Sequence, residues 1–91
     1  MVAAVVLIRA ERDSIPSAAR EVAEIDGVAE VYSVSGEWDL VAIVRVAEWE
    51  QIADVVADRI ARTPGLERTE TLIAFRVYSK EDLDAAYEMF D

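Results

Sequence analysis

The strongest constraint on the fold is a pattern that occurs twice along the chain: a short apolar strand, a helix with one apolar face, and a second strand. Gly27 and Gly65, separated by 38 positions, precede the second strand of each copy. The segments GVAEVYSV and GLERTETL that begin at these glycines match in pattern. Strands are predicted at residues 3–10, 28–35, 40–47 and 66–78. Two consecutive strand–helix–strand units are the order of elements in a ferredoxin-like fold.

Each predicted helix lies between the two strands of its unit. Ser14 can cap the first helix and Pro16 suits its first turn. Gly27 and Gly65 can end the two helices in the left-handed conformation. Apolar residues recur at helical spacing at Ile15, Ala18, Ala19 and Val22, and at Trp49, Ile52, Ala53, Val56 and Ile60. Right-handed crossovers place both helices on one face of the sheet. The predicted fold class is therefore α+β, a ferredoxin-like βαββαβ arrangement with a four-stranded antiparallel sheet.

Both faces of the predicted strands are apolar, although two helices can cover only one face. A sheet with one solvated face should alternate apolar and polar residues. Instead, Val5 and Leu7 point one way from the first strand, while Val6 and Ile8 point the other way. The uncovered face would expose an apolar patch larger than is usual for a monomer. We therefore predict a homo-oligomer built from dimers that pack sheet to sheet as a dimeric α/β barrel, burying about 800 Å² per subunit.

One domain is predicted at residues 1–78, followed by a helical extension at residues 79–91. Ser79 and Asp82 form a capping pattern at the start of the extension. Its apolar residues lie along one side, at Leu83, Ala86, Tyr87 and Phe90. Folding of this extension over the uncovered sheet face is the alternative to a second copy, but the extension is short and highly charged. We expect it to dock on its own domain or on a neighbouring subunit.

Composition excludes several classes of function. The chain has no Cys and no His, which removes thiolate chemistry, the commonest general base and the commonest transition-metal ligands. Its formal net charge of −10 disfavours direct binding of nucleic acid. It carries neither a Gly-rich phosphate loop nor an acidic loop with calcium-binding spacing, so no catalytic residue, cofactor or metal is predicted. No apolar run reaches the roughly 18 residues of a membrane span and no export signal is found, so we expect a cytoplasmic location.

The segment that joins the second and third strands is the most informative for function. Ser35, Gly36, Glu37, Trp38 and Asp39 follow one another there. In a structural interpretation, Gly36 supplies the turn, Asp39 caps a local backbone turn and Trp38 packs on an edge. In a functional interpretation, backbone amides at Gly36 and Trp38 bind a carboxylate while Asp39 accepts an amino group. Both interpretations are compatible with the residues alone.

The segments SGEWDLVAIVRV and PGLERTETLIAF resemble the ligand-binding domain of the Lrp/AsnC family, also called the RAM domain. The resemblance covers roughly residues 3–78 and is carried by Gly36, Glu37, Trp38 and Asp39, then by Pro64, Gly65, Leu66, Thr69 and Thr71. It implies dimers that assemble further into octamer-like or decamer-like rings, with amino-acid effectors held at the contacts between dimers. Carried over to this chain, the ligand-binding residues are Ser35, Gly36, Glu37, Trp38, Asp39, Thr69 and Thr71.

Two features depart from the family pattern. Full-length family members carry an N-terminal helix-turn-helix, whereas the first strand here begins at residue 2 or 3, so the chain is similar to a stand-alone form of the domain. Trp38 stands where Tyr is more usual, which leaves the identity of the effector open. The resemblance implies a non-enzymatic, amino-acid-sensing module. It would modulate transcription through a partner, such as a full-length Lrp-like regulator, without binding DNA or a membrane itself.

Three alternative functions stay open at this point. A small dimeric α/β barrel enzyme of the cofactor-free monooxygenase type is compatible with the fold, although the lack of His removes the usual haem ligand and acid–base group. An ACT-like regulatory domain has the same ferredoxin-like fold and also binds amino acids. The combination of Trp38 and Asp39 with Thr69 and Thr71 favours the Lrp/AsnC-like sensing module over it. A purely architectural oligomer without a working site is the third.

Overall fold

The computed structural model describes residues 1–78 and residue 80 of the 91-residue chain. In chain order the elements are β1 (Val2–Ala10), the 3₁₀ turn η1 (Arg12–Ser14), α1 (Ile15–Ala23), β2 (Val28–Ser33), β3 (Leu40–Val46), α2 (Glu50–Ala53), the π-helical segment η2 (Asp54–Arg59), the 3₁₀ turn η3 (Ile60–Arg62) and β4 (Leu66–Ile73). The two strand–helix–strand units are therefore present as predicted.

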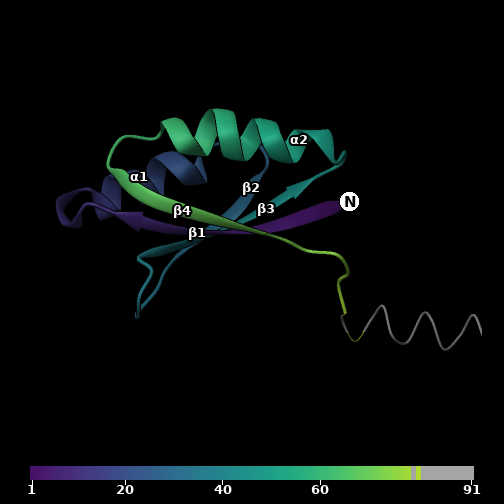
Figure 1. Ribbon diagram of the computed structural model, residues 1–91, viewed down its shortest axis with the longest axis horizontal. Helices are drawn as coiled ribbons and strands as arrows, with labels where there is room; N and C mark the ends of the chain where they lie inside the picture. Colours follow the sequence, from purple (N-terminus) through teal and green to yellow (C-terminus); the bar gives the residue numbers. More distant parts are fainter. Residues whose placement is uncertain (79, 81–91) are drawn as a thin grey trace, which may run out of the picture.

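The strands form one antiparallel sheet in the order β2-β3-β1-β4, and the described helices lie on one of its faces (Figure 1). β1 lies in the middle and pairs with β3 on one side and β4 on the other. Within this register, Val6 lies between Ala42 and Thr71. Opposed residues of an antiparallel pair share a face, so these three side chains point toward the helices. This is the ferredoxin-like arrangement expected from two right-handed crossovers.

The hydrophobic core lies between that face and the helices. Alternate residues of the two central strands are buried in it, because successive side chains of a strand point to opposite faces. The strands contribute Ala4, Val6, Ile8, Ala10, Leu40, Ala42, Val44 and Val46, and the helices contribute Ala18, Val22, Ile52, Val55 and Ile60. Central strands that are apolar on this face thus hold both helices against the sheet.

The opposite face of the sheet, which we call the open face, carries an apolar strip with the charged residues Arg9, Arg45 and Arg68 around it. Val5 of β1 lies between Ile43 of β3 and Leu72 of β4, so an apolar strip crosses three strands. Leu72 is 49% exposed in the single chain, while Val5, Leu7 and Ile43 are half-buried. The prediction that both faces of the strands are apolar is confirmed.

Three details of the helices differ from the prediction. Ser14 occupies the N-cap position of α1, but its side chain makes no capping hydrogen bond. Its backbone is already helical (φ −99°, ψ −4°) because η1 runs into α1, and a capping side chain needs a non-helical backbone. The second helix is divided into α2, η2 and η3, and its π-helical turn brings Val55 into the core in addition to Ile52 and Ile60. Trp49, expected on the apolar stripe, is 56% exposed.

Three strands are shorter than predicted, and one of them, β3, ends only one residue early, at Val46. β2 ends at Ser33, and β4 ends at Ile73 rather than at Tyr78. The last paired residues of β1 and β4 are Ala4 and Ile73, and the N–H of Ala74 still donates to Ala3 O. β4 leaves the sheet there, although β1 continues to Val2 and pairs with β3. Residues 75–78 continue past the sheet and bend away from the helices (Figure 1). The predicted helical extension at residues 79–91 lies, except for Lys80, outside the described residues.

Candidate functional site

The turn between β2 and β3 projects from one end of the sheet. The N–H of Val34 donates to Asp39 O at 3.1 Å and closes the turn. Gly36 has a φ of +111°, in the left-handed region that favours glycine, and no atom lies within 4 Å of where its Cβ would be. Ser35 and Glu37 are exposed on either side of it. The turn is therefore an open loop: the amides at its two ends, Val34 and Asp39, are bonded, whereas within the described residues the N–H groups of residues 35–38 have no hydrogen-bond acceptor.

Asp39 attaches this turn to β1. Its Oδ2 accepts a hydrogen bond from the N–H of Ala10 at 2.9 Å, and its own N–H donates to Ile8 O at 2.9 Å. The carboxylate thus binds a strand that lies far away in sequence, instead of capping the local turn. Within the described part of the chain its second oxygen accepts no hydrogen bond, so one acceptor stays open to a ligand.

Two arginines lie beside the turn. The guanidinium carbon of Arg68 is 5.2 Å from the centroid of the Trp38 ring, which is a cation–π contact. The Nε of Arg9 donates to Glu37 O at 3.0 Å. Arg9 and Arg68 are directly opposite each other in the pairing of β1 with β4, on the open face. Like charges in this position repel each other, and a bound anion would relieve the repulsion.

Sequence reasoning missed these two arginines. They are 59 positions apart, the difference between residues 68 and 9. The signal that identifies them is the strand register, which brings Arg9 opposite Arg68 and was not predicted.

Thr69 and Thr71 lie on the other face of the sheet. Thr69 is opposite Ile8 and Thr71 is opposite Val6, both of which are buried under the helices. Thr69 is exposed and Thr71 is half-buried. Trp38 stacks with Arg68 on the open face, so one chain does not bring the threonines and the turn together around a single small ligand. A ligand that touches both groups would have to lie between two copies of the chain.

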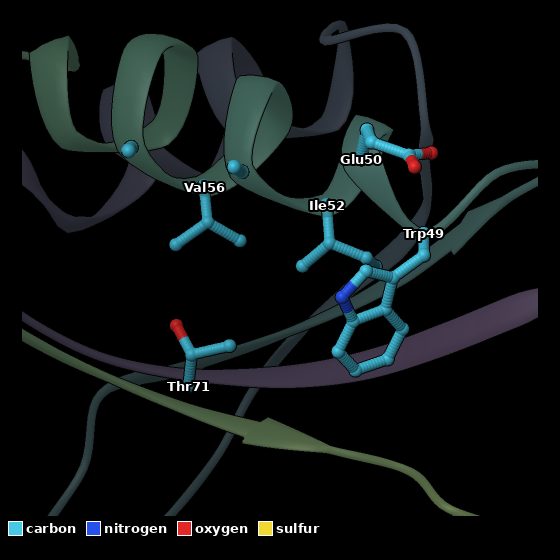
Figure 2. A pocket seen from close by; sticks show the side chains of 7 residues that line it. Trp49, Glu50, Ile52, Val56 and Thr71 are labelled. Atoms are coloured by element: carbon cyan, nitrogen blue, oxygen red, sulfur yellow. The ribbon is translucent and has the colours of Figure 1, made fainter.

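A separate apolar groove runs between α2, η2 and β4. Its volume is about 490 Å³, and it is lined by Trp49, Glu50, Ile52, Ala53, Val56, Ala57 and Thr71. Three side chains of the helix point toward the sheet, those of Trp49, Ile52 and Val56, and Thr71 faces them from β4 (Figure 2). The sequence placed several of these residues on a core-facing stripe. The exposure of Trp49 and of Ala53 leaves part of that stripe uncovered.

One further pair of charged residues in the described part of the chain lies outside both the turn and the groove. Arg45 and Glu30 form an exposed ion pair at 3.3 Å between β3 and β2. The Glu30 carboxylate raises the pKa of the neighbouring Tyr32 hydroxyl. Among the described residues no three acidic side chains gather closely enough to hold a metal ion. In the same part of the chain, no helix is long and apolar enough to cross a membrane.

Comparison with known proteins gives a consistent result. The family described as the Lrp/AsnC ligand binding domain matches residues 3–83. An uncharacterized HTH-type transcriptional regulator of Pyrococcus furiosus, PF0250, is 36% identical over 81 residues, which are 86% of this chain and 54% of that protein. The chain therefore spans about half the length of the curated relatives it matches.

Two solved structures illustrate the range of similarity. TTHA0845 from Thermus thermophilus is 48% identical, with a TM-score of 0.83, over 88% of this chain and 100% of that one. The transcriptional regulator NMB0573 from Neisseria meningitidis, solved as an L-Met complex, is 14% identical, with a TM-score of 0.75 over 86% of this chain and 52% of that one. The second similarity concerns the fold alone.

Proposed function

Because this chain belongs to the Lrp/AsnC ligand-binding domain family, we propose that it is a regulatory module that binds an amino acid and acts through a partner transcriptional regulator in the cytoplasm. The relatives that carry this domain are named as HTH-type transcriptional regulators, which supports a role in regulation rather than catalysis. Direct binding to DNA is disfavoured by the net charge of −10, so the signal passes by contact between proteins.

The observation that carries the proposal is the cluster of charged groups around the turn. An amino acid presents one carboxylate and one ammonium group, and both need partners of opposite charge when they leave water. Arg9 and Arg68 supply cations for the carboxylate, together with the open backbone amides near Gly36. The free oxygen of Asp39 accepts from the ammonium group.

The threonines of β4 complete the proposed site from a second copy. Since Thr69 and Thr71 face away from the turn of their own chain, their hydroxyls meet the ligand only where two copies approach each other. The sheet-to-sheet dimer itself rests on the apolar open face, because water would otherwise contact a strip that crosses three strands. In this proposal, ligand binding between copies couples the amino-acid concentration to the assembly state.

A screen of the twenty standard amino acids by thermal shift identifies the effector, because a ligand that binds only the folded protein raises its Tm. Calorimetric titration of that amino acid then tests the charged cluster. We expect Arg68→Gln to weaken binding at least about tenfold, in line with the loss of a charged hydrogen bond.

Arg45→Gln is the matched control. Arg45 lies on the same open face, but it pairs with Glu30 away from the turn. We expect its affinity for the amino acid to stay within about twofold of the wild type. Equal weakening by both variants would attribute the effect to the general charge of the face, and a screen in which no amino acid raises the Tm would overturn the proposed ligand class.

A further inference from the structure

The apolar groove lies along a sheet edge that has no partner strand in the described residues. β4 is the last strand in the sheet order, so one row of its N–H and C=O groups faces outward. On the helix side the groove is opened by two small residues one turn apart, Ala53 and Ala57. An edge of this kind next to an apolar groove is suited to binding an extended apolar segment, whose backbone adds to the sheet.

The chain also carries a segment of this kind. Phe75 is 95% exposed, Val77 is 66% exposed and Tyr78 is 74% exposed, immediately after β4. In an extended conformation Phe75 and Val77 point to the same side, because alternate residues share a face. Large apolar side chains are rarely left this exposed together without a binding partner.

This segment is directed away from the groove of its own chain. The groove is on the helix side of the sheet, whereas residues 75–78 leave the end of β4 and bend to the side opposite the helices (Figures 1 and 2). To reach its own groove the chain would have to reverse direction at once around the end of β4. A second copy of the chain can present its groove without such a reversal.

We propose that residues 75–78 of one copy bind in the groove of a second copy, as an added strand along β4. Phe75 and Val77 then fill the apolar space under Ile52 and Val56, and the outward N–H and C=O groups of β4 gain partners. This contact uses neither the open face nor the turn, so it joins dimers to one another.

The charges of the two surfaces agree with this pairing. Arg76 lies between the two inserted side chains and is one of nine basic residues in a chain with nineteen acidic ones. Glu50 is among the lining residues, at the Trp49 end of the groove, and its carboxylate points outward, away from Ile52, Val56 and Thr71 (Figure 2). A cationic segment is therefore attracted to the mouth of the groove, whereas most of this acidic surface repels other copies.

Sedimentation velocity at micromolar concentration tests the proposal with two variants. Phe75→Ser alters the inserted segment and Ala53→Glu blocks the groove, and both residues are exposed in the single chain, so neither change disturbs the core. The wild type should form an assembly larger than a dimer. Each variant should raise the concentration at which that assembly forms at least about tenfold and leave dimers.

Mixing the two variants provides the decisive measurement. The Ala53→Glu dimer keeps an intact segment and the Phe75→Ser dimer keeps an intact groove, so the mixture should regain a species larger than a dimer. Ala23→Glu, on the exposed side of α1, is the control and should assemble like the wild type. These readouts are made without an amino acid, so they test the contact between copies separately from ligand binding, even though Thr71 belongs both to the groove and to the proposed ligand site.

Several results would overturn the proposal. Assembly of both variants at the wild-type concentration would show that the groove and the segment are not joined. A wild type that stops at the dimer, or a mixture that fails to regain the larger species, would do the same. If removal of residues 79–91 abolished assembly while Phe75→Ser assembled like the wild type, the groove would bind the later part of the chain instead of residues 75–78. If Phe75→Ser lowered the Tm without changing the mass of the assembly, residues 75–78 would bind in the groove of their own chain.

Discussion

Substitution of Asp39 separates a structural role of its carboxylate from a role in binding. Oδ2 accepts from the N–H of Ala10 at 2.9 Å, in a half-buried position. Asp39→Ala removes this acceptor and leaves the N–H without a protein partner, which should lower the free energy of unfolding by about 1–3 kcal/mol. Asp39→Asn keeps an oxygen in the same place, loses the charge and replaces the second oxygen with an NH₂ donor, so its cost should be about 1 kcal/mol or less.

The effect on binding should not follow the effect on stability. The ammonium group of a bound amino acid requires a negatively charged acceptor, and removal of one partner from a desolvated charge pair costs about 2–5 kcal/mol, which is about 30-fold or more in affinity. Both variants should therefore lose measurable binding, although Asp39→Asn stays nearly as stable as the wild type. The dimer should persist in both, because it rests on the open face.

Urea unfolding at a fixed protein concentration and calorimetric titration with the amino acid found by thermal shift measure the two effects. Asp39→Asn is the decisive variant because its fold is least affected. If it binds within about threefold of the wild type, the carboxylate has only a structural role and the ammonium contact is wrong. If Asp39→Ala dissolves the dimer, the hydrogen bond to Ala10 supports the interface as well as the turn.

Four further predictions follow from particular contacts. Gly65→Ala should lower the free energy of unfolding by about 2–4 kcal/mol, because its φ is +87° and a Cβ there would lie 2.5 Å from the Cβ of Ser14. Gly36→Ala, at a φ of +111° in open space, should lower the free energy of unfolding by only about 1–2 kcal/mol. If urea unfolding gave the same loss for Gly36→Ala and Gly65→Ala, the contact with Ser14 would not be the reason for the larger effect at Gly65. Leu7→Arg places a charge on the open face and should convert dimers to folded monomers in sedimentation; an unchanged mass would exclude a dimer through that face. Thr71→Val should weaken amino-acid binding by about 1 kcal/mol in calorimetry, and no change would exclude its hydroxyl from the site.

Most of the fold could be predicted because its signals are local. The alternation of Val6 and Ile8 with Val5 and Leu7 indicates a strand with two apolar faces without reference to any other part of the chain. The repetition of the strand–helix–strand unit, with Gly27 and Gly65 in matching positions, is enough to predict the sheet and the face on which the helices lie. The boundaries that were wrong depend on pairing across the sheet: β4 leaves β1 after Ile73, although β1 continues to Val2 and pairs there with β3.

The candidate site was predictable only in part, for a related reason. Gly36 and Asp39 were found because a turn has a local signature and because the segment resembles a known family. The bond from Ala10 to Asp39 and the opposition of Arg9 and Arg68 depend on strand register across the sheet, which local residue preferences do not specify. The groove depends on the path of the π-helical turn, which brings Val55 inward and leaves Ala53 exposed.

By itself, the sequence determined that two helices cover one face of a four-stranded sheet and that the other face is apolar. The tertiary structure decided which side of the sheet each candidate residue faces: Thr69 and Thr71 toward the helices, and Arg68 beside Trp38 on the open face. The physical reason is that the alternation of side chains along a strand depends only on adjacent residues. The neighbours of a side chain across the sheet come from chain segments tens of residues away. Those neighbours are chosen by the packing of the whole domain.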